Sequence, residues 1–116
     1  MKLREIIEKL DFKVVNESDN MDVNIRRGYA SDMLSDVIAN VGADDVWITI
    51  QAHQNIVAVA VLKGVAAIII ANKRNINQET IAKAKSENVA LMLSELPVFE
   101  IAGRLYDMGI RGITEQ

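Results

Sequence analysis

The sequence contains no cysteine and only one histidine among its 116 residues. Without cysteine the chain forms neither disulfides nor thiolate metal sites, and it has no cysteine nucleophile. A single histidine offers no pair of imidazoles at the spacing that metal sites use, and no serine nucleophile motif adjoins it. We therefore expect no metal site. The sequence also gives no support for a hydrolase that uses a serine or cysteine nucleophile.

Basic residues are also scarce, because Lys and Arg number 13 against 16 Asp and Glu, which leaves a formal net charge of −3. No basic stripe runs along the chain, so a nucleic-acid backbone would be repelled. A Walker-type phosphate loop and a GxGxxG pattern are both absent, which removes the usual signals of NTPases and dehydrogenases. We expect no nucleic-acid partner and no cofactor.

Long apolar runs are missing as well. The most apolar stretch, residues 55–71, is divided by Lys63-Gly64 into two runs that are far shorter than the ~20 residues needed to cross a bilayer. The first twelve residues alternate charged and apolar side chains, unlike a signal peptide. The expectation is one domain, residues 1–116, of a soluble cytoplasmic protein without a membrane partner.

What the sequence does contain is an alternation of helical and strand-like segments, and half of its residues are hydrophobic. The predicted helices are residues 2–10, 31–41, 55–62, 78–88 and a last helix from Pro97; the predicted strands are residues 12–15, 23–27, 46–50, 65–71 and 89–93. Residues 55–62 are β-branched enough for a strand, but Lys63-Gly64 is typical of a helix end and a hairpin here would lack a turn glycine. The alternation predicts an α/β fold, a three-layer sandwich around a mainly parallel β-sheet.

Several helices have predicted inner faces. Ser31 or Asp32 is a candidate cap for the second helix, which Gly42 ends. The residues expected to face inward are Met33, Leu34, Val37, Ile38 and Val41 in that helix, Ile81, Ala82 and Ala84 in the fourth, and Val98, Ile101, Ala102, Leu105 and Tyr106 in the last. We expect Trp47 to be a core or interface residue.

Polar residues follow the predicted strands, where open parallel sheets bind their ligands. The candidate ligand-binding residues at this carboxyl edge are Arg27, Gly28, Ser31, Asp32, Gln51, His53, Asn55 and Asn72. The segments Arg26-Arg27-Gly28 and Asn72-Lys73-Arg74 could each recognise an anion, or could simply be solvated.

Two alternatives stay open among these residues. His53 can close a turn, contact a ligand or act as a general acid or base. Asp32 and Asp36, four residues apart on one helix, can bind a divalent cation, or can serve as a cap and a surface charge.

Three stretches together resemble the DRTGG domain family: GYASDMLSDVIANV, DDVWITIQAHQNIVAVAVLKGVAAIIIAN and PVFEIAGRLYDMG. The resemblance covers roughly residues 1–109. The chain resembles in particular the short stand-alone members of the family. The signature that names the family is Asp-Arg, a spacer, and then Val-Thr-Gly-Gly, whereas residues 22–28 of this chain read DVNIRRG. Asp22 and Gly28 keep the signature residues. Val23 replaces the arginine, Arg26 replaces the threonine and Arg27 replaces the first glycine.

The resemblance implies a regulatory or architectural role, since DRTGG domains accompany phosphotransacetylase, the HPr kinase/phosphorylase and CBS-domain pyrophosphatases without being the catalytic unit. The family's polar loops map onto Gly28, Tyr29, Ser31 and Asp32, and onto Gln51, His53 and Asn55. Our leading hypothesis is a non-catalytic module that forms a homodimer, acts on a partner enzyme and senses a small anionic metabolite or nucleotide. The alternative is a structural homodimerisation or partner-docking domain without a ligand, and a small enzyme using His53 with Asp32 is a third.

Overall fold

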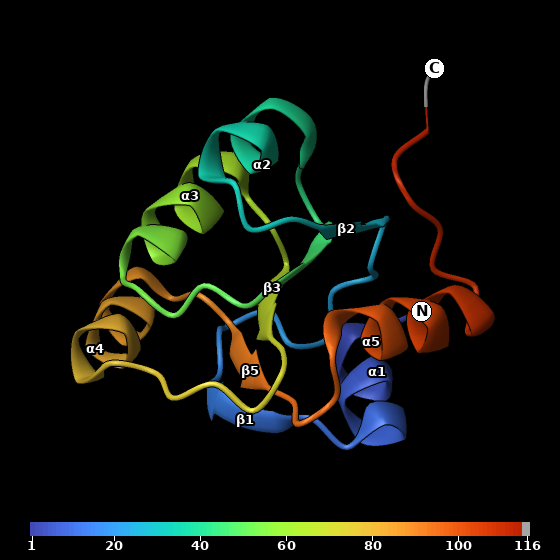
Figure 1. The fold of residues 1–116 in the computed structure, drawn as a ribbon, viewed down its shortest axis with the longest axis horizontal. Coiled ribbons are helices and arrows are strands. Elements are labelled where there is room, and N and C mark those ends of the chain that lie inside the picture. Colours follow the sequence, from blue (N-terminus) through green and yellow to red (C-terminus); the bar gives the residue numbers. More distant parts are fainter. Residues whose placement is uncertain (115–116) are drawn as a thin grey trace.

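The computed structural model describes residues 1–114. In chain order the elements are α1 (Leu3–Leu10), β1 (Lys13–Asn16), β2 (Gly28–Ala30), α2 (Leu34–Asn40), β3 (Val46–Thr49), α3 (Asn55–Lys63), β4 (Ala67–Ile70), α4 (Gln78–Glu87), β5 (Leu91–Leu93) and α5 (Val98–Asp107) (Figure 1). The strands form a five-stranded sheet in the order β1-β5-β4-β3-β2, in which only β1 is antiparallel to its neighbour. The predicted α/β fold around a mainly parallel sheet is confirmed.

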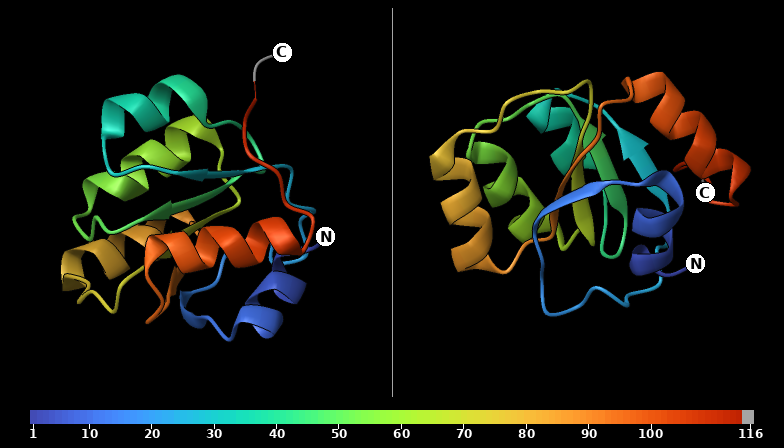
Figure 2. Two further views of the ribbon diagram at one scale, coloured as in Figure 1. Left: turned by 45° about the vertical axis from the view of Figure 1, so that its right-hand side comes forward. Right: turned by 90° about the horizontal axis from the view of Figure 1, so that it is seen from below.

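The helices lie in two layers, one on each face of the sheet (Figure 2). Strands β2, β3, β4 and β5 are added side by side in one direction, and parallel crossovers share one hand. The crossover helices α2, α3 and α4 therefore all cover the same face, and α1 and α5 cover the other.

Each central strand is apolar on both sides, as a strand sandwiched between helices must be. In β3, Trp47 packs toward α2 and α3, whereas its neighbours Val46 and Ile48 pack toward α1 and α5. In β4, Ile68 faces the same side as Trp47 and Ile69 faces the other. Trp47 is fully buried, which confirms its expected place in the core.

The run from Asn55 is a helix, as predicted, and it ends at Gly64 in the left-handed region with φ +71°. Ile56, Val57 and Ala60 are buried, so the β-branched composition serves packing in the middle of the three-helix layer. In residues 1–114, no helix is both long enough and apolar enough to cross a membrane.

The predicted strand at residues 23–27 is wrong, because β2 occupies residues 28–30. The alternation of Val23 and Ile25 has another cause: the backbone here pairs with the N-terminus, since Leu3 N donates to Val23 O and Ile25 N donates to Met1 O. Ile25 is buried beneath α1 rather than in the sheet. Gly28 therefore begins a strand instead of following one.

Some residues predicted to face the core are exposed instead. They are Met33 and Ile38 beside and on α2, Ala82 on α4 and Tyr106 on α5. The inner side of α4 is formed by Ala84 and by Thr80, a fully buried polar residue. Thr80 fits there because its hydroxyl donates to Ala52 O at 2.7 Å.

Both edges of the sheet are short and irregular. The pairing of β1 with β5 changes register between Val14 and Asn16, and the Asn16 side chain donates to Val89 O at 2.9 Å. At the other edge, Gly112 forms an isolated parallel bridge with Gly28, whose N–H donates to Arg111 O.

Candidate ligand-binding site

The carboxyl ends of β2, β3, β4 and β5 meet at one edge of the sheet, where their connecting loops gather. Six of the eight residues predicted to contact a ligand belong to the loops and the helix start at this carboxyl edge: Ser31, Asp32, Gln51, His53, Asn55 and Asn72. The parallel sheet brings these segments together as expected.

Asp32 joins the loop after β2 to the loop after β3. Its Oδ1 accepts hydrogen bonds from Thr49 Oγ1 at 2.8 Å and from Ile50 N at 2.9 Å, and Gln51 Nε2 donates to Asp32 O at 3.2 Å. Asp32 is therefore not the cap of α2, whose N-cap is Met33 without a side-chain hydrogen bond. Ser31 closes the turn before the helix, because its Oγ accepts from Met33 N at 3.3 Å.

His53 occupies the turn before α3 with an exposed side chain. Its Nδ1 accepts a hydrogen bond from Asn55 N at 3.2 Å, and its carbonyl accepts one from Ile56 N at 3.1 Å. These two bonds satisfy amides at the start of the helix, which would otherwise lack partners. This geometry favours the turn-closing role among the three that the sequence left open.

Arg27 and Gly28 lie at the opposite, amino-terminal edge, so their predicted place at the carboxyl edge is wrong. The cause is the shifted position of β2. Arg27 Nε and Nη2 donate to the fully buried carboxylate of Asp45 at 3.1 and 3.0 Å, and Gly42 N donates to the same carboxylate at 2.7 Å. Arg27 thus neutralises a buried charge and is already engaged.

Asp36 is engaged as well, because Tyr29 donates its hydroxyl proton to Asp36 Oδ2 at 2.7 Å. This hydrogen bond lowers the pKa of Asp36 and raises the pKa of Tyr29. Asn40 Nδ2 donates to the other carboxylate oxygen at 3.1 Å. Within residues 1–114, no group of three or more His, Cys, Asp or Glu side chains is placed to hold a metal ion.

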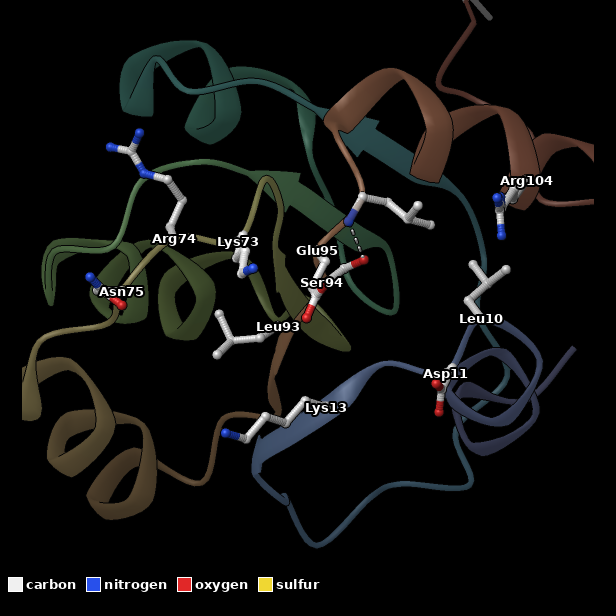
Figure 3. Close-up of a pocket in the computed structure, with 11 residues that line it drawn as sticks. Leu10, Asp11, Lys13, Lys73, Arg74, Asn75, Leu93, Ser94, Glu95 and Arg104 are labelled. Carbon is white, nitrogen blue, oxygen red and sulfur yellow. Dashed lines mark hydrogen bonds between the residues drawn. The ribbon is translucent and has the colours of Figure 1, made fainter.

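A hollow of about 560 Å³ opens at the carboxyl ends of β4 and β5 (Figure 3). We call it the basic pocket, because its charged lining residues are the cations Lys13, Lys73, Arg74 and Arg104 and the carboxylates Asp11 and Glu95. These side chains come from the turn after α1, the start of β1, the loops after β4 and β5, and α5, and Figure 3 shows Arg74 and Arg104 at opposite sides of the pocket.

Most of the cations in the basic pocket have no carboxylate partner. Arg104 Nε lies 3.7 Å from Glu100 Oε1, in an exposed pair on one helix. Lys13, Lys73 and Arg74 form no salt bridge with any residue of the described chain, 1–114. The pocket therefore has a net positive lining even though the whole chain is acidic.

The loop after β4 holds its shape through an unusual backbone. Asn72 and Lys73 both have positive φ, 67° and 55°, although neither is glycine. The loop is fixed by Asn72 N donating to Leu96 O at 2.8 Å and Lys73 N donating to Ser94 O at 3.0 Å. Conformations of this kind persist only where neighbouring structure enforces them, and they cluster at functional sites.

Sequence reasoning considered Lys73 and Arg74 but missed Lys13 and Arg104 as their companions. Lys13 lies there because β1 is antiparallel, so the start of β1 pairs with the end of β5 at Leu93. Arg104 arrives on α5 from the far end of the chain. Neither position carries a local sequence signal, because only the strand order creates the proximity.

Comparison with known proteins supplies a structural likeness. The sequence matches no protein-family model, and it has no significant match among curated proteins. The fold is similar to a solved structure of the CBS and DRTGG domains of the regulatory region of Clostridium perfringens pyrophosphatase, complexed with its activator diadenosine tetraphosphate. The TM-score is 0.76 at 18% sequence identity, and the match covers 99% of this chain but only 51% of that one. The likeness thus establishes that this α/β fold occurs in a regulatory region, and the chain spans about half of that neighbour.

Proposed function

We propose that the protein is a DRTGG-type regulatory module without catalytic activity, which binds a small anionic metabolite or nucleotide at the carboxyl edge of its sheet. The structural neighbour supports this at the level of the fold, because it is a regulatory region rather than a catalytic one. That neighbour binds a nucleotide activator, and the same class of ligand is proposed here. The proposal includes a cytoplasmic location and a partner enzyme that the module regulates.

The observation that carries the proposal is the basic pocket itself. It lies where ligands bind in open α/β sheets, and its volume of about 560 Å³ suits a metabolite-sized ligand. Its positive lining in an acidic protein concentrates anions at one place on the surface. The six predicted polar residues at the same edge remain proposed ligand contacts.

Isothermal titration of the full chain against AMP, ATP, diadenosine tetraphosphate, pyrophosphate and citrate tests the proposal. We expect at least one of these anions to bind with a dissociation constant below a millimolar. A ligand that binds only the folded state also raises the free energy of unfolding, by about 2.7 kcal/mol when its concentration is a hundred times the dissociation constant. The melting temperature rises as a result. The proposal fails if none of these anions binds at millimolar concentration.

A second candidate function is homodimerisation or partner docking without a ligand. It is favoured by two aromatic side chains on α5, Phe99 and Tyr106, which are 85% and 58% exposed. Large exposed aromatics are typical of interfaces. A monomer that captures no partner would count against this function.

A further inference from the structure

We infer that the basic pocket binds the phosphate chain of a nucleoside polyphosphate through Lys13, Lys73, Arg74 and Arg104. This inference rests on the proposed function and deepens it, because it names the ligand class and the side chains that hold it. It also places the phosphate chain at the β4 and β5 end of the carboxyl edge.

The number and arrangement of the cations point to more than one phosphate. Lys73 and Arg74 follow β4, Lys13 begins β1 and Arg104 belongs to α5, so the cations come from three separate parts of the lining, and Figure 3 shows the Arg74 side chain extending outward from its rim. A carboxylate or a single phosphate can meet one or two of these groups at a time. A di- or triphosphate chain has the length and charge to meet cations on separate walls.

The kinds of cation fit this assignment. A guanidinium presents parallel N–H groups that match two phosphate oxygens, whereas an ammonium contributes a compact charge with rotatable donors. The basic pocket contains two of each, and three of the four have no carboxylate partner among residues 1–114. Binding a phosphate there breaks no buried ion pair.

The remaining lining suits the other parts of a nucleotide. Asp11 and Glu95 are acceptors for hydroxyl groups, which a ribose carries. Leu10, Leu93 and Leu96 supply apolar surface against which a base can pack. A purely inorganic polyphosphate would leave both sets of groups unused, so we assign the nucleoside form.

The loop after β4 is held ready for such a ligand. The hydrogen bonds from Asn72 N to Leu96 O and from Lys73 N to Ser94 O fix this loop against the loop after β5. These bonds join the two loops that line the basic pocket, and a loop that is already ordered loses less conformational entropy on binding than a free one.

The test compares ATP, pyrophosphate and citrate by isothermal titration on the full chain and on single variants. Lys13→Gln and Arg74→Gln each remove one charge from separate walls of the pocket. Lys85→Gln is the matched control, because Lys85 is an exposed cation of α4 that does not line the pocket.

We expect ATP to bind more tightly than pyrophosphate, and both to bind more tightly than citrate. Lys13→Gln and Arg74→Gln should each weaken ATP binding about tenfold or more, since each removes a charge-assisted contact. Lys85→Gln should change it less than about twofold. Circular dichroism of each variant checks that the fold is kept.

The inference is overturned, while the proposed function stands, if citrate binds as tightly as ATP, or if ATP binds and the Lys13 and Arg74 variants leave its affinity unchanged. Pyrophosphate binding as tightly as ATP overturns the nucleoside part of the assignment. If none of the tested anions binds, both the inference and the proposed function fail.

Discussion

The guanidinium of Arg27 forms two hydrogen bonds with a carboxylate that has no exposure to solvent, that of Asp45. In the sequence, Arg27 is indistinguishable from an anion-binding arginine, because it stands beside another arginine and a glycine. What decides its role is the burial of Asp45, eighteen residues away, and burial of a single aspartate is not visible in a local pattern.

Replacement of Arg27 by Met should destabilise the protein, because it leaves the Asp45 charge buried and unpaired. Arg27 is itself a quarter exposed, so water can partly replace it, and we expect a loss of about 2–3 kcal/mol in the free energy of unfolding. Arg26→Met is the control: Arg26 is exposed, and the change should stay within about 0.5 kcal/mol. Urea denaturation measures both, and equal effects would contradict the assignment.

Tyr29→Phe should raise the pKa of Asp36 toward its ordinary value, because the hydroxyl proton that holds it down is gone. A carboxyl with a lowered pKa stabilises the fold above its unfolded pKa, and this contribution is lost as the pH falls through the folded pKa. The stability difference between wild type and Tyr29→Phe should therefore be present at neutral pH and shrink below pH ~4.

Carboxyl chemical shifts followed by NMR during a pH titration report the pKa of Asp36 directly. Tyr106→Phe serves as the control, because Tyr106 lies on α5, which covers the opposite face of the sheet from α2 and Asp36. An unchanged Asp36 pKa in Tyr29→Phe would show that the hydroxyl is not the cause.

At the scale of elements, most helices and strands were predictable because their periodicity and their ends agree. α3 is the clearest case: its β-branched residues allow a strand, and Gly64 decides for a helix. The position of β2 was predicted wrongly, because a strand of three residues is too short to show a periodic pattern. Val23 and Ile25 do alternate with polar residues, but the cause is their packing and pairing beside α1. Because the strand was predicted five residues too early, Arg27 and Gly28 were predicted at the carboxyl edge of the sheet and not at the amino-terminal edge, where they lie.

Two glycine-to-alanine substitutions should change the free energy of unfolding in opposite directions. At Gly64, φ is +71°, so Gly64→Ala is expected to cost about 1 kcal/mol through backbone strain alone, as the added Cβ would meet Ala43 only at 3.7 Å. At Gly103, inside α5, the added Cβ meets nothing within 4 Å, and alanine is the better helix former. We expect Gly103→Ala to stabilise by about 0.5–1 kcal/mol. Denaturant midpoints measure both changes, and the same sign for both would refute the argument.

At the scale of the whole molecule, the fold class could be predicted from the order of apolar segments in the sequence. The candidate site could be predicted only in part. The carboxyl edge was predictable, because parallel strands end together. The basic pocket was not, since Lys13 and Arg104 join Lys73 only through the antiparallel placement of β1 and the path of α5.

The predicted homodimer is best tested on α5, where Phe99 and Tyr106 lie seven residues apart and so on one side of the helix. If this face joins two copies, Phe99→Glu should convert the dimer to a monomer in light scattering, because a charge would be buried at the contact. Leu62→Glu on α3, at a position 67% exposed, is the control and should leave the dimer intact. A wild-type monomer at micromolar concentration would contradict the dimer, and dissociation by Leu62→Glu alone would place it on the other layer.

The irregular sheet edges limit how copies of this protein can associate. Long, flat, unpaired strands act as templates on which further chains add, and this is how soluble folds convert to fibrils. Here β1 has four residues with an interrupted register, and β2 has three residues with Gly112 beside its first one. Neither edge offers a run of backbone groups long enough to seed such growth. A concentrated solution should therefore resist amyloid formation, and its specific contacts should be made through helices and loops.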